Sequence, residues 1–355
     1  MIKNHKKLVK RVGDHHTIGR SPLKRNPLIK ACLFGSLMLI VQHAYALQFT
    51  VSVPPLAGLI QPLLDKEDTI VVLLKPGVSP HGFQLKPSHL RAIESSDAVF
   101  SIGTPVDYWL EKTLQRVEKP VLKMSELQAL HTLPIRNGGL WLQGGDDDGD
   151  KHAHEHSHAH QPDVQNKLKN RGHYDGHIWL SLDNAMLFVN QAAAIIKQLK
   201  PTQVDFIEQN KQAWLTQLKQ LDTKLKKQLD PVKDRPFVVL HDAYQYFEKH
   251  YQLNGVGSVR LNPAISPSLK RVQQLRNSIK QGQIACVFKE PQFPEKRVLA
   301  VVRGLDVKVG SLDPMGSFLP GRHAKKEAEE FVPYDVLLQA LANAITTCLT
   351  PQNKE

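Results

Sequence analysis

The chain is 355 residues long and carries a formal net charge of +12, with 41% hydrophobic and 23% charged residues. This length allows two domains with cores of their own, and the composition is too apolar for a disordered chain. Three cysteines in such a length exclude a small disulfide-stapled protein. A charge of +12 raises nucleic acid or an acidic membrane as a partner, so its position along the chain decides its meaning.

Most of the excess charge lies in the first 46 residues. This segment holds nine Lys or Arg and one acid, Asp14, so the rest of the chain carries only +4. An apolar run over 31–41 and then Ala44-Tyr45-Ala46 follow, which is the order of a secretory signal peptide cleaved after Ala46. The run is too short to span a bilayer, which takes about 20 residues. We expect a leader at 1–46 and a periplasmic protein; a basic arm that binds nucleic acid is the alternative.

Removal of the leader leaves two cysteines, Cys286 and Cys348. An even number of cysteines in an oxidising compartment predicts a disulfide. Closing a loop of about sixty residues stabilises a fold by about 4 kcal/mol in the chain-entropy model. Two buried free thiols are the alternative.

Short β-branched runs alternate with helix-like stretches along the rest of the chain. We expect strands at 49–53, 69–74, 97–102, 237–240, 283–288 and 307–310. Between the two groups, apolar residues at helical spacing predict long helices at 182–199 and 203–229, which end before Pro201 and Pro231.

This order predicts an α/β fold of two (β/α) lobes with parallel sheets. We expect a helical connection between the two lobes. Ligands of parallel sheets bind at the carboxyl ends of the strands, so the cleft between the lobes is the expected site. Lys270, Arg271 and Arg276 are expected on a solvated helix face.

One long segment, 137–172, fits no helix or strand. It is rich in Gly, Asp and His, and a stretch of this length inside a domain is usually functional or disordered. Its centre alternates five histidines with other residues: His152, His154, His156, His158 and His160. This pattern indicates contact with a divalent transition metal and says little about which metal. A merely solvated loop is the alternative.

Three other histidines lie where a predicted strand ends or a helix begins. His81 follows the strand at 69–74, His177 precedes the helix at 182–199, and His241 ends the strand at 237–240. Each alone is more typical of a hydrogen-bonded loop residue. Together they bring imidazoles from both lobes to one cleft, and three imidazoles suit zinc with a fourth position open to a carboxylate or water. Asp313, after the strand at 307–310, is placed to supply that carboxylate.

Five ordered segments resemble a known family: GVSPHGFQLKPS, DGHIWLSLDNA, VVLHDAYQYFEKHYQL, ACVFKEPQF and SLDPMG. They are similar to the zinc-type, zinc-uptake solute-binding proteins of bacterial ABC transporters, in the metal-binding cluster of periplasmic receptors. The resemblance covers almost all of the chain after the leader. It implies two (β/α) lobes, at 47–181 and 200–355, joined by one long rigid helix that matches 182–199, and a metal site in the cleft between the lobes.

The resemblance also implies roles for particular residues. His81, His177 and His241 match the three histidine ligands of Zn(II), and Cys286 and Cys348 match the disulfide of zinc-type members. Some zinc-type members have a glutamate directly before the first histidine, where this chain has Pro80. The fourth ligand is then Asp313, which matches an aspartate of sister subgroups, or water. Manganese-type relatives have a glutamate at the place of His241, so the imidazole favours zinc.

These observations predict a monomeric periplasmic receptor that captures Zn(II) as its cargo and delivers it to an ABC permease driven by an ATPase. The histidine loop would then collect zinc at low affinity. A zinc buffer or adhesin is the first alternative. A zinc hydrolase is the second, but the sequence shows neither a helical pair of histidines with a glutamate base nor a nucleophile elbow. We expect no enzyme activity and no nucleic acid partner.

Overall fold

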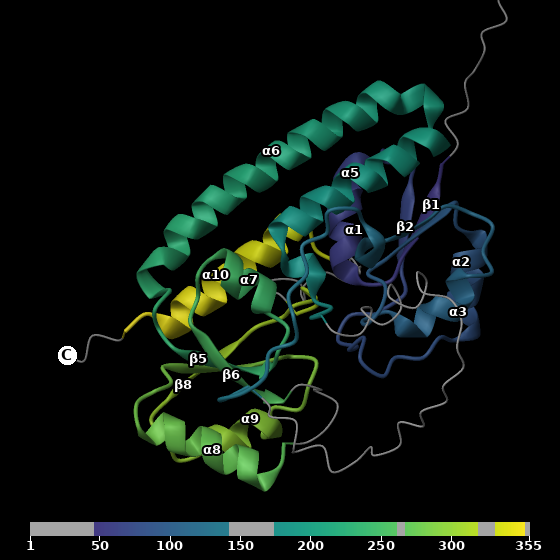
Figure 1. Cartoon of the computed structure of the whole chain (residues 1–355). Coiled ribbons are helices and arrows are strands. Elements are labelled where there is room, and N and C mark those ends of the chain that lie inside the picture. Colours follow the sequence, from purple (N-terminus) through teal and green to yellow (C-terminus); the bar gives the residue numbers. More distant parts are fainter. Residues whose placement is uncertain (1–45, 142–173, 261–266, 319–330, 352–355) are drawn as a thin grey trace, which may run out of the picture. The chain divides into compact units, whose positions relative to one another are not determined.

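Two parallel sheets with the same strand order form the framework. A computed structural model describes residues 46–141, 174–260, 267–318 and 331–351, and residues 46–355 belong to one unit. The first sheet has the order β2-β1-β3-β4 and the second the order β6-β5-β7-β8, with every pair parallel. The predicted α/β fold with two parallel sheets is therefore confirmed (Figure 1).

The first lobe contains the elements β1 (Gln48–Val51), α1 (Pro54–Ile60), β2 (Thr69–Val72), α2 (Pro87–Ser95), β3 (Ala98–Ser101), α3 (Glu111–Leu114) and β4 (Val121–Lys123). Two helices follow, α5 (Leu182–Leu199) and α6 (Val204–Leu229). The second lobe contains β5 (Phe237–His241), α7 (Gln245–His250), β6 (Gly255–Arg260), α8 (Leu269–Lys280), β7 (Cys286–Lys289), α9 (Lys296–Val302), β8 (Lys308–Ser311) and α10 (Tyr334–Leu349).

All six predicted strands overlap strands of the structure, and two strands were not predicted. The strand β4 has only three residues and follows Pro120, so it is too short for a periodic signal. The strand β6 contains Gly255 and Gly257, and glycine is depleted in strands. Gly257 is needed because a Cβ there would lie 2.3 Å from the carbonyl oxygen of Leu140.

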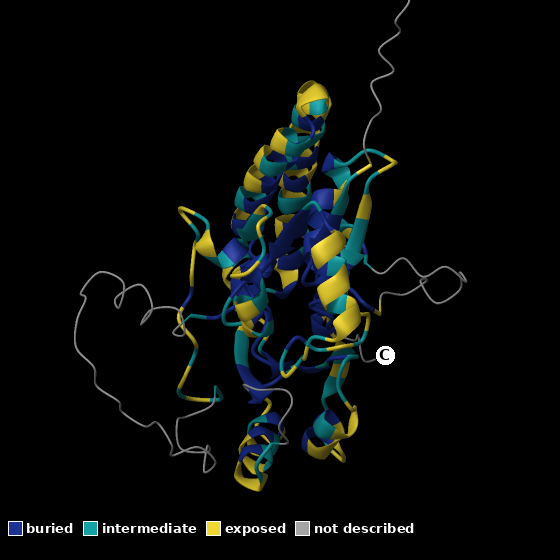
Figure 2. Ribbon diagram, turned by 90° about the vertical axis from the view of Figure 1, so that its right-hand side faces the viewer, coloured by how far each residue is buried: buried dark blue, intermediate teal, exposed yellow. Residues whose placement is uncertain are grey.

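Both long helices form where the apolar spacing predicts them. Ser181 begins α5 by accepting a hydrogen bond from the N–H of Asn184, and the buried face of α5 includes Phe188, Val189 and Ile196. The helix α6 buries Trp214, Leu218 and Leu225 at spacings of four and seven, with lysines on its solvent side. Figure 2 shows this division, with buried residues in the central strands of the sheets and exposed residues on the outer faces of the helices.

The helix that joins the lobes differs from the prediction, which placed the link at 182–199. That segment is α5, which packs against α1 of the first lobe and against α6. The chain passes to the second lobe along α6, which starts beside the first lobe and ends just before β5 (Figure 1). Its start is fixed by Lys200, whose Nζ lies 2.6 Å from carboxylate oxygens of Asp65 and Asp68.

A single apolar cluster runs through both lobes and the helices between them. It includes Phe49 and Phe100 of the first sheet, Phe237 and Phe288 of the second, and Tyr334 of α10. Because the cluster continues from one lobe into the other, a hinge motion that separated them would expose apolar side chains to water. Among the described residues, no helix has the length and apolar character needed to cross a bilayer.

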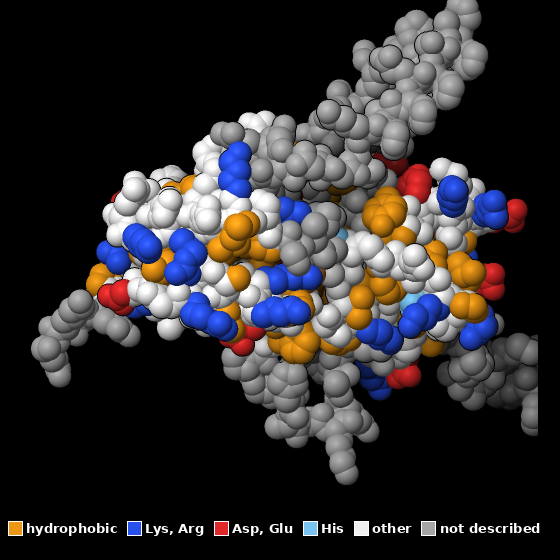
Figure 3. Space-filling model, turned by 90° about the horizontal axis from the view of Figure 1, so that it is seen from below, with side chains coloured by type: hydrophobic (Ala, Val, Ile, Leu, Met, Phe, Trp, Pro, Cys, Tyr) orange, Lys and Arg blue, Asp and Glu red, His pale blue; other side chains and the backbone are white. Residues whose placement is uncertain are grey.

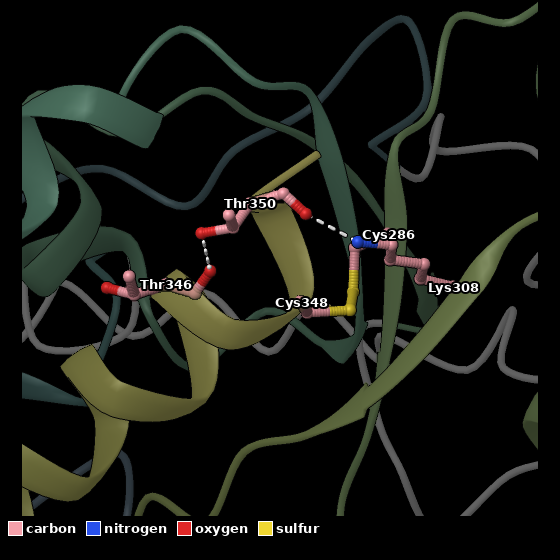
Figure 4. Close-up of a disulfide and its surroundings, with 5 residues drawn as sticks. All are labelled: Cys286, Lys308, Thr346, Cys348 and Thr350. Atoms are coloured by element: carbon pink, nitrogen blue, oxygen red, sulfur yellow. Dashed lines mark hydrogen bonds between the residues drawn. A yellow bond between two sulfur atoms is a disulfide. The ribbon is translucent and has the colours of Figure 1, made fainter. Parts of the chain in front are cut away.

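The predicted disulfide between Cys286 and Cys348 is present. It joins the first residue of β7 to the last turn of α10, with 6.0 Å between the two Cα atoms (Figure 4). Beside it, Nζ of Lys308 in β8 donates to the carbonyl of Thr350. The end of α10 is thus tied to two strands of the second sheet.

Arg271 does not lie on a solvated face, which corrects the prediction for 270–276. The side chain is buried, and its guanidinium donates to the carbonyl oxygens of Ser258 and Leu140. Helical spacing places Arg271 on the same side of α8 as the buried Leu275. An arginine in a sequence predicts an exposed side chain, because buried arginines are rare.

Candidate metal centre

The carboxyl ends of the second sheet supply one wall of the centre. His241 is the last residue of β5, Glu290 follows β7 directly, and Asp313 comes two residues after β8. Because β5, β7 and β8 are parallel neighbours, these side chains come to one edge of the sheet.

The first lobe supplies the other two histidines. His81 lies in the loop between β2 and α2, where its N–H donates to the hydroxyl of Ser79 at 3.2 Å. His177 precedes the short helical turn Ile178–Leu180, which leads into α5. Trp179 in this turn is fully buried and donates from Nε1 to the carbonyl of Pro314 at 3.0 Å, so it fixes the turn against the second lobe.

The three predicted histidines meet in one group. A ligand nitrogen from each of His81, His177 and His241 lies within 4.8 Å of the other two. The Nε2 atoms of His177 and His241 are 3.2 Å apart. Nitrogens bound to one tetrahedral zinc at 2.0–2.1 Å would be about 3.3 Å apart. The spacing of this pair therefore fits a shared zinc ion.

Two buried carboxylates, neither of them predicted from the sequence, orient two of the imidazoles. Oδ1 of Asp175 lies 2.7 Å from Nδ1 of His177, and Oε1 of Glu290 lies 2.6 Å from Nδ1 of His241. Each carboxylate fixes the proton on Nδ1 and leaves the Nε2 lone pair free for a metal. A signal was available, because Asp175 stands two residues before His177 and Glu290 follows a predicted strand.

The protonation of the histidines differs, and only that of His81 favours a metal by itself. Burial, together with the nearby His241 and His177, lowers the pKa of His81 to about 2, so His81 is neutral. Its Nε2 atom is buried and has no hydrogen-bond partner. Burial would also lower the pKa of His177, but the charge and hydrogen bond of Asp175, together with the charges of Asp242 and Glu290, outweigh it and raise that pKa above its ordinary value.

The space between the histidines is small. It measures about 10 Å³ and is lined by the three histidines with Ser79, Pro80, Glu290, Gln292, Phe293, Pro314 and Met315. A volume of this size holds about one water-sized body. The site can therefore hold a single ion.

Asp313 is not brought into the histidine group. Its Oδ1 accepts the N–H groups of Met315 and Gly316, both at 3.0 Å, and its Oδ2 accepts that of Phe318 at 2.7 Å. The Gln292 side chain also donates to Oδ1. Burial raises the pKa of this carboxyl. In this state Asp313 holds the turn that carries Pro314 and Met315, two of the residues that line the ion space.

The remaining predicted metal ligands cannot be placed. His152, His154, His156, His158 and His160 lie outside the described residues. Pro80, which stands where some relatives have a glutamate, is buried and lines the ion space.

Comparison with known proteins identifies the family. Residues 50–347 match the family model described as "ZnuA: Zinc-uptake complex component A periplasmic". The chain belongs to this family.

Curated members of the family align over most of their length. The high-affinity zinc uptake system protein ZnuA of Brucella suis biovar 1 (strain 1330) is 32% identical over 313 residues, which are 84% of this chain and 91% of that protein. The protein of the same description from Yersinia pestis is 30% identical over 334 residues, 92% of this chain and 99% of that protein. The family therefore applies to most of the chain.

Solved structures agree on the fold. A crystal structure of ZnuA has a TM-score of 0.66 at 23% identity and covers 86% of this chain and 100% of its own. The periplasmic zinc binding protein TroA from Treponema pallidum has a TM-score of 0.67 at 19% identity, with the same coverage. The two-lobe fold implied by the sequence resemblance is confirmed.

Proposed function

We propose that this chain is a periplasmic receptor that captures Zn(II) in the cleft between its lobes and delivers it to an ABC permease with an ATPase. The zinc-uptake family supports the transport function. One observation of the structure carries the proposal: three imidazoles converge on a one-ion space, with two Nε2 atoms at the spacing of zinc ligands. Zinc is the cargo.

His81, His177 and His241 are the proposed ligands, and water takes the fourth position. Asp313 was the alternative for that position, but its oxygens already accept hydrogen bonds from three backbone N–H groups and one side chain. A ligating Asp313 would have to release several of these bonds. A set of imidazoles without a carboxylate suits zinc better than manganese, which prefers oxygen ligands.

The size of the site supports a receptor over a zinc hydrolase. A hydrolase needs room for an organic substrate beside the metal, and pockets for such ligands measure about 300–1,000 Å³. The space here is about 10 Å³. The two carboxylates near the imidazoles are each engaged with an Nδ1 atom, so neither is free to act as a general base on a water. We therefore assign no catalytic role to the chain.

Delivery to a permease separates a transport receptor from a zinc buffer or an adhesin. The permease, its ATPase and a monomeric receptor belong to the proposal. Return of the gene to zinc-starved cells that lack it tests transport. Restored growth supports transport, and unrestored growth of cells whose protein binds zinc normally favours a buffer.

We assign no nucleic acid partner, because most of the excess charge belongs to the proposed leader. On the face seen in Figure 3, Lys and Arg side chains are distributed among apolar and uncharged side chains.

We propose a leader at 1–46 with cleavage after Ala46; its residues 1–45 lie outside the described residues. The N–H of Leu47 donates to Oδ1 of Asp68 at 2.9 Å, and β1 begins one residue later. Cleavage after Ala46 would turn this nitrogen into an ammonium group and the hydrogen bond into an ion pair. Amino-terminal sequencing of the periplasmic protein tests this, and any first residue other than Leu47 would contradict the proposed cleavage site.

The histidine loop is proposed to collect zinc at low affinity. Calorimetry of the mature protein should show one tight site together with weaker sites. The weaker sites should disappear when His152, His154, His156, His158 and His160 are replaced by Ser, while the tight site remains.

Competition with a chromophoric chelator tests the ligand set. His81→Ala, His177→Ala and His241→Ala should each lower the zinc affinity by more than about 100-fold, because each removes a ligand from the ion. His250→Ala is the matched control, since His250 pairs with Asp222 of α6 and does not line the ion space. A ligand variant that binds zinc as the wild-type protein does would remove that histidine from the set.

A further inference from the structure

Residues 133–141, which we name the strap, cross from the first lobe to the second. At one end, the carbonyl of Leu133 accepts the N–H of Asp175 at 2.8 Å. At the other end, Leu140 forms a parallel bridge with Gly257 of β6. The carbonyl of Leu140 also accepts hydrogen bonds from the N–H of Ser258 and from the buried Arg271. The strap thus ends at the edge of the second sheet.

Arg136 fixes the middle of the strap to the second lobe. Its Nε lies 3.1 and 3.0 Å from the two oxygens of Asp242, and its Nη1 donates to Glu248 of α7. The side chains are 17%, 7% and 4% exposed, respectively. The Cζ atom of Arg136 lies 3.5 Å from the ring centre of Trp141, so the indole covers the guanidinium. The planar guanidinium holds its N–H donors in fixed directions, whereas a lysine is a point charge on a flexible stem, so the two residues are not interchangeable here.

The position of Glu248 requires a glycine in the neighbouring strand. A Cβ at Gly255 would lie 2.3 Å from Oε2 of Glu248. The buried carboxylate, the glycine that makes room for it and the arginine that neutralises it come from three separate segments. Because three segments fit one another in this way, the ion pair between Arg136 and Glu248 is a specific feature of the fold.

Tyr246 of α7 makes the second connection between the lobes. Its hydroxyl accepts the N–H of Leu133 at 3.0 Å and donates to the carbonyl of Asp175 at 2.7 Å. Asp175 in turn holds Nδ1 of His177. The segment of Asp175 belongs to the first lobe, since the hydroxyl of Tyr174 donates to the carbonyl of Thr104 at 2.6 Å. One helix of the second lobe therefore holds the residue that orients a histidine of the first.

These contacts connect both faces of the metal centre. Arg136 acts on Asp242, which follows His241 directly, and Tyr246 acts on Asp175, which orients His177. Neither Arg136 nor Tyr246 is among the residues that line the ion space. Both are positioning residues. The Nε2 atoms of His177 and His241 already lie 3.2 Å apart although they come from different lobes.

We propose that Arg136 and Tyr246 form an interlobe latch that holds His177 and His241 at ligand spacing before the metal arrives and thereby slows its release. The proposal rests on the proposed function, because it assigns the latch to the zinc site. A site formed in advance binds without an ordering cost, and loss of a latch affects mainly the dissociation rate.

Zinc release into an excess of chelator, followed by stopped flow on the mature protein, gives the first test. Arg136→Met and Tyr246→Phe should each speed release about tenfold or more, as expected for the truncation of buried hydrogen-bonded groups. Arg136→Lys should fall between Arg136→Met and wild type. Arg276→Met is the matched control, because Arg276 binds only carbonyls of its own lobe among the contacts seen, such as that of Val301 at 3.0 Å.

The outcomes of this test are distinct. Wild-type release rates in folded Arg136→Met and Tyr246→Phe would overturn the latch, and so would an equal effect of Arg276→Met. If Arg136→Met does not fold, Arg136→Lys and Tyr246→Phe decide between the same outcomes. Thermal unfolding of each metal-free variant separates lost stability from faster release, since a merely structural role predicts a lower Tm with an unchanged release rate.

A distance measurement without metal gives the second test and does not depend on zinc binding. Spin labels at Lys112→Cys in α3 and Lys280→Cys in α8, both exposed positions, report the separation of the lobes. The wild-type background should give a narrow distance distribution, and Arg136→Met a broader one. Equal distributions would overturn the latch. If the wild-type protein binds no zinc, the proposed function fails, and this measurement still decides whether the latch exists.

Discussion

The substitution Glu290→Gln tests how strongly a residue that does not bind the metal affects the zinc affinity of the site. The Glu290 side chain is 1% exposed, and its Oε1 lies 2.6 Å from Nδ1 of His241. Glutamine keeps the shape and an oxygen that can accept the Nδ1 proton, but it removes the negative charge that makes the Nε2 lone pair of His241 a stronger donor. The substitution therefore isolates the charge from the geometry.

The expected loss of zinc affinity is about 10- to 100-fold, the usual range for a carboxylate behind a metal-bound histidine. This corresponds to about 1.4–2.7 kcal/mol. The metal-free protein should not lose stability. Glu290 is a buried charge, and it also raises the pKa of the buried Asp313. Removal of one of two neighbouring buried carboxylates relieves repulsion and desolvation. Affinity should thus fall while the Tm of the metal-free protein stays equal or rises.

Competition against a chromophoric zinc chelator gives the affinity, and calorimetric unfolding of the metal-free protein gives the Tm. Glu295→Gln is the control, because Glu295 is exposed and pairs with Lys289 at the same end of β7. The control should bind zinc as the wild-type protein does. If Glu290→Gln binds zinc within about twofold of wild type, the charge of Glu290 does not act on His241 as argued.

Three further predictions concern pH, the disulfide and the packing of His177. Asp175 raises the pKa of His177 above its ordinary value, so protons should compete with zinc already above pH 6.5. The zinc affinity should therefore fall as the pH drops from about 7.5 to about 6. In calorimetric titrations, Asp175→Asn should move this fall in affinity to lower pH. In the metal-free protein, the same shift stabilises the fold below about pH 6.5, and this stabilisation is lost as pH rises through the folded-state pKa. Paired Cys286→Ser and Cys348→Ser substitutions should lower the free energy of unfolding by about 4 kcal/mol in urea titrations, and the effect of reductant on the wild-type protein should match. Gly176→Ala should weaken zinc binding and lower the Tm, because the new Cβ would lie 2.8 Å from side-chain carbons of Pro105 and Val106; unchanged binding would show that the segment before His177 can shift freely.

The fold follows from the sequence where packing is periodic. The apolar spacing of α5 and α6 and six β-branched runs predict elements that the structure contains. The role of α6 as the link was missed, because spacing shows which face of a helix is buried and does not show against which lobe. Strand β6 was missed because Gly255 and Gly257 serve contacts with Glu248 and Leu140, which lie far away in the sequence.

The metal site, like the fold, could be predicted from the sequence only in part. Histidines at strand ends stand out because imidazoles suit zinc, and the structure brings His81, His177 and His241 together. The carboxylates behind them do not stand out, because an acid near the end of a strand has many ordinary uses. Asp313 shows the converse: its place after β8 favoured a ligand, whereas its contacts are those of a turn. Its partners are backbone N–H groups, and the residue types in a sequence do not show which backbone groups bind a carboxylate.

The small volume of the ion space has a consequence for how zinc arrives. Zinc in the periplasm carries water molecules or an organic chelator, and a space of about 10 Å³ admits neither shell intact. The ion must therefore exchange its old ligands for imidazoles one at a time. His81 is the least buried of the three histidines, so it is placed to make the first exchange. Loading from a strong chelator should then be limited by how fast that chelator lets go, whatever the final affinity of the site.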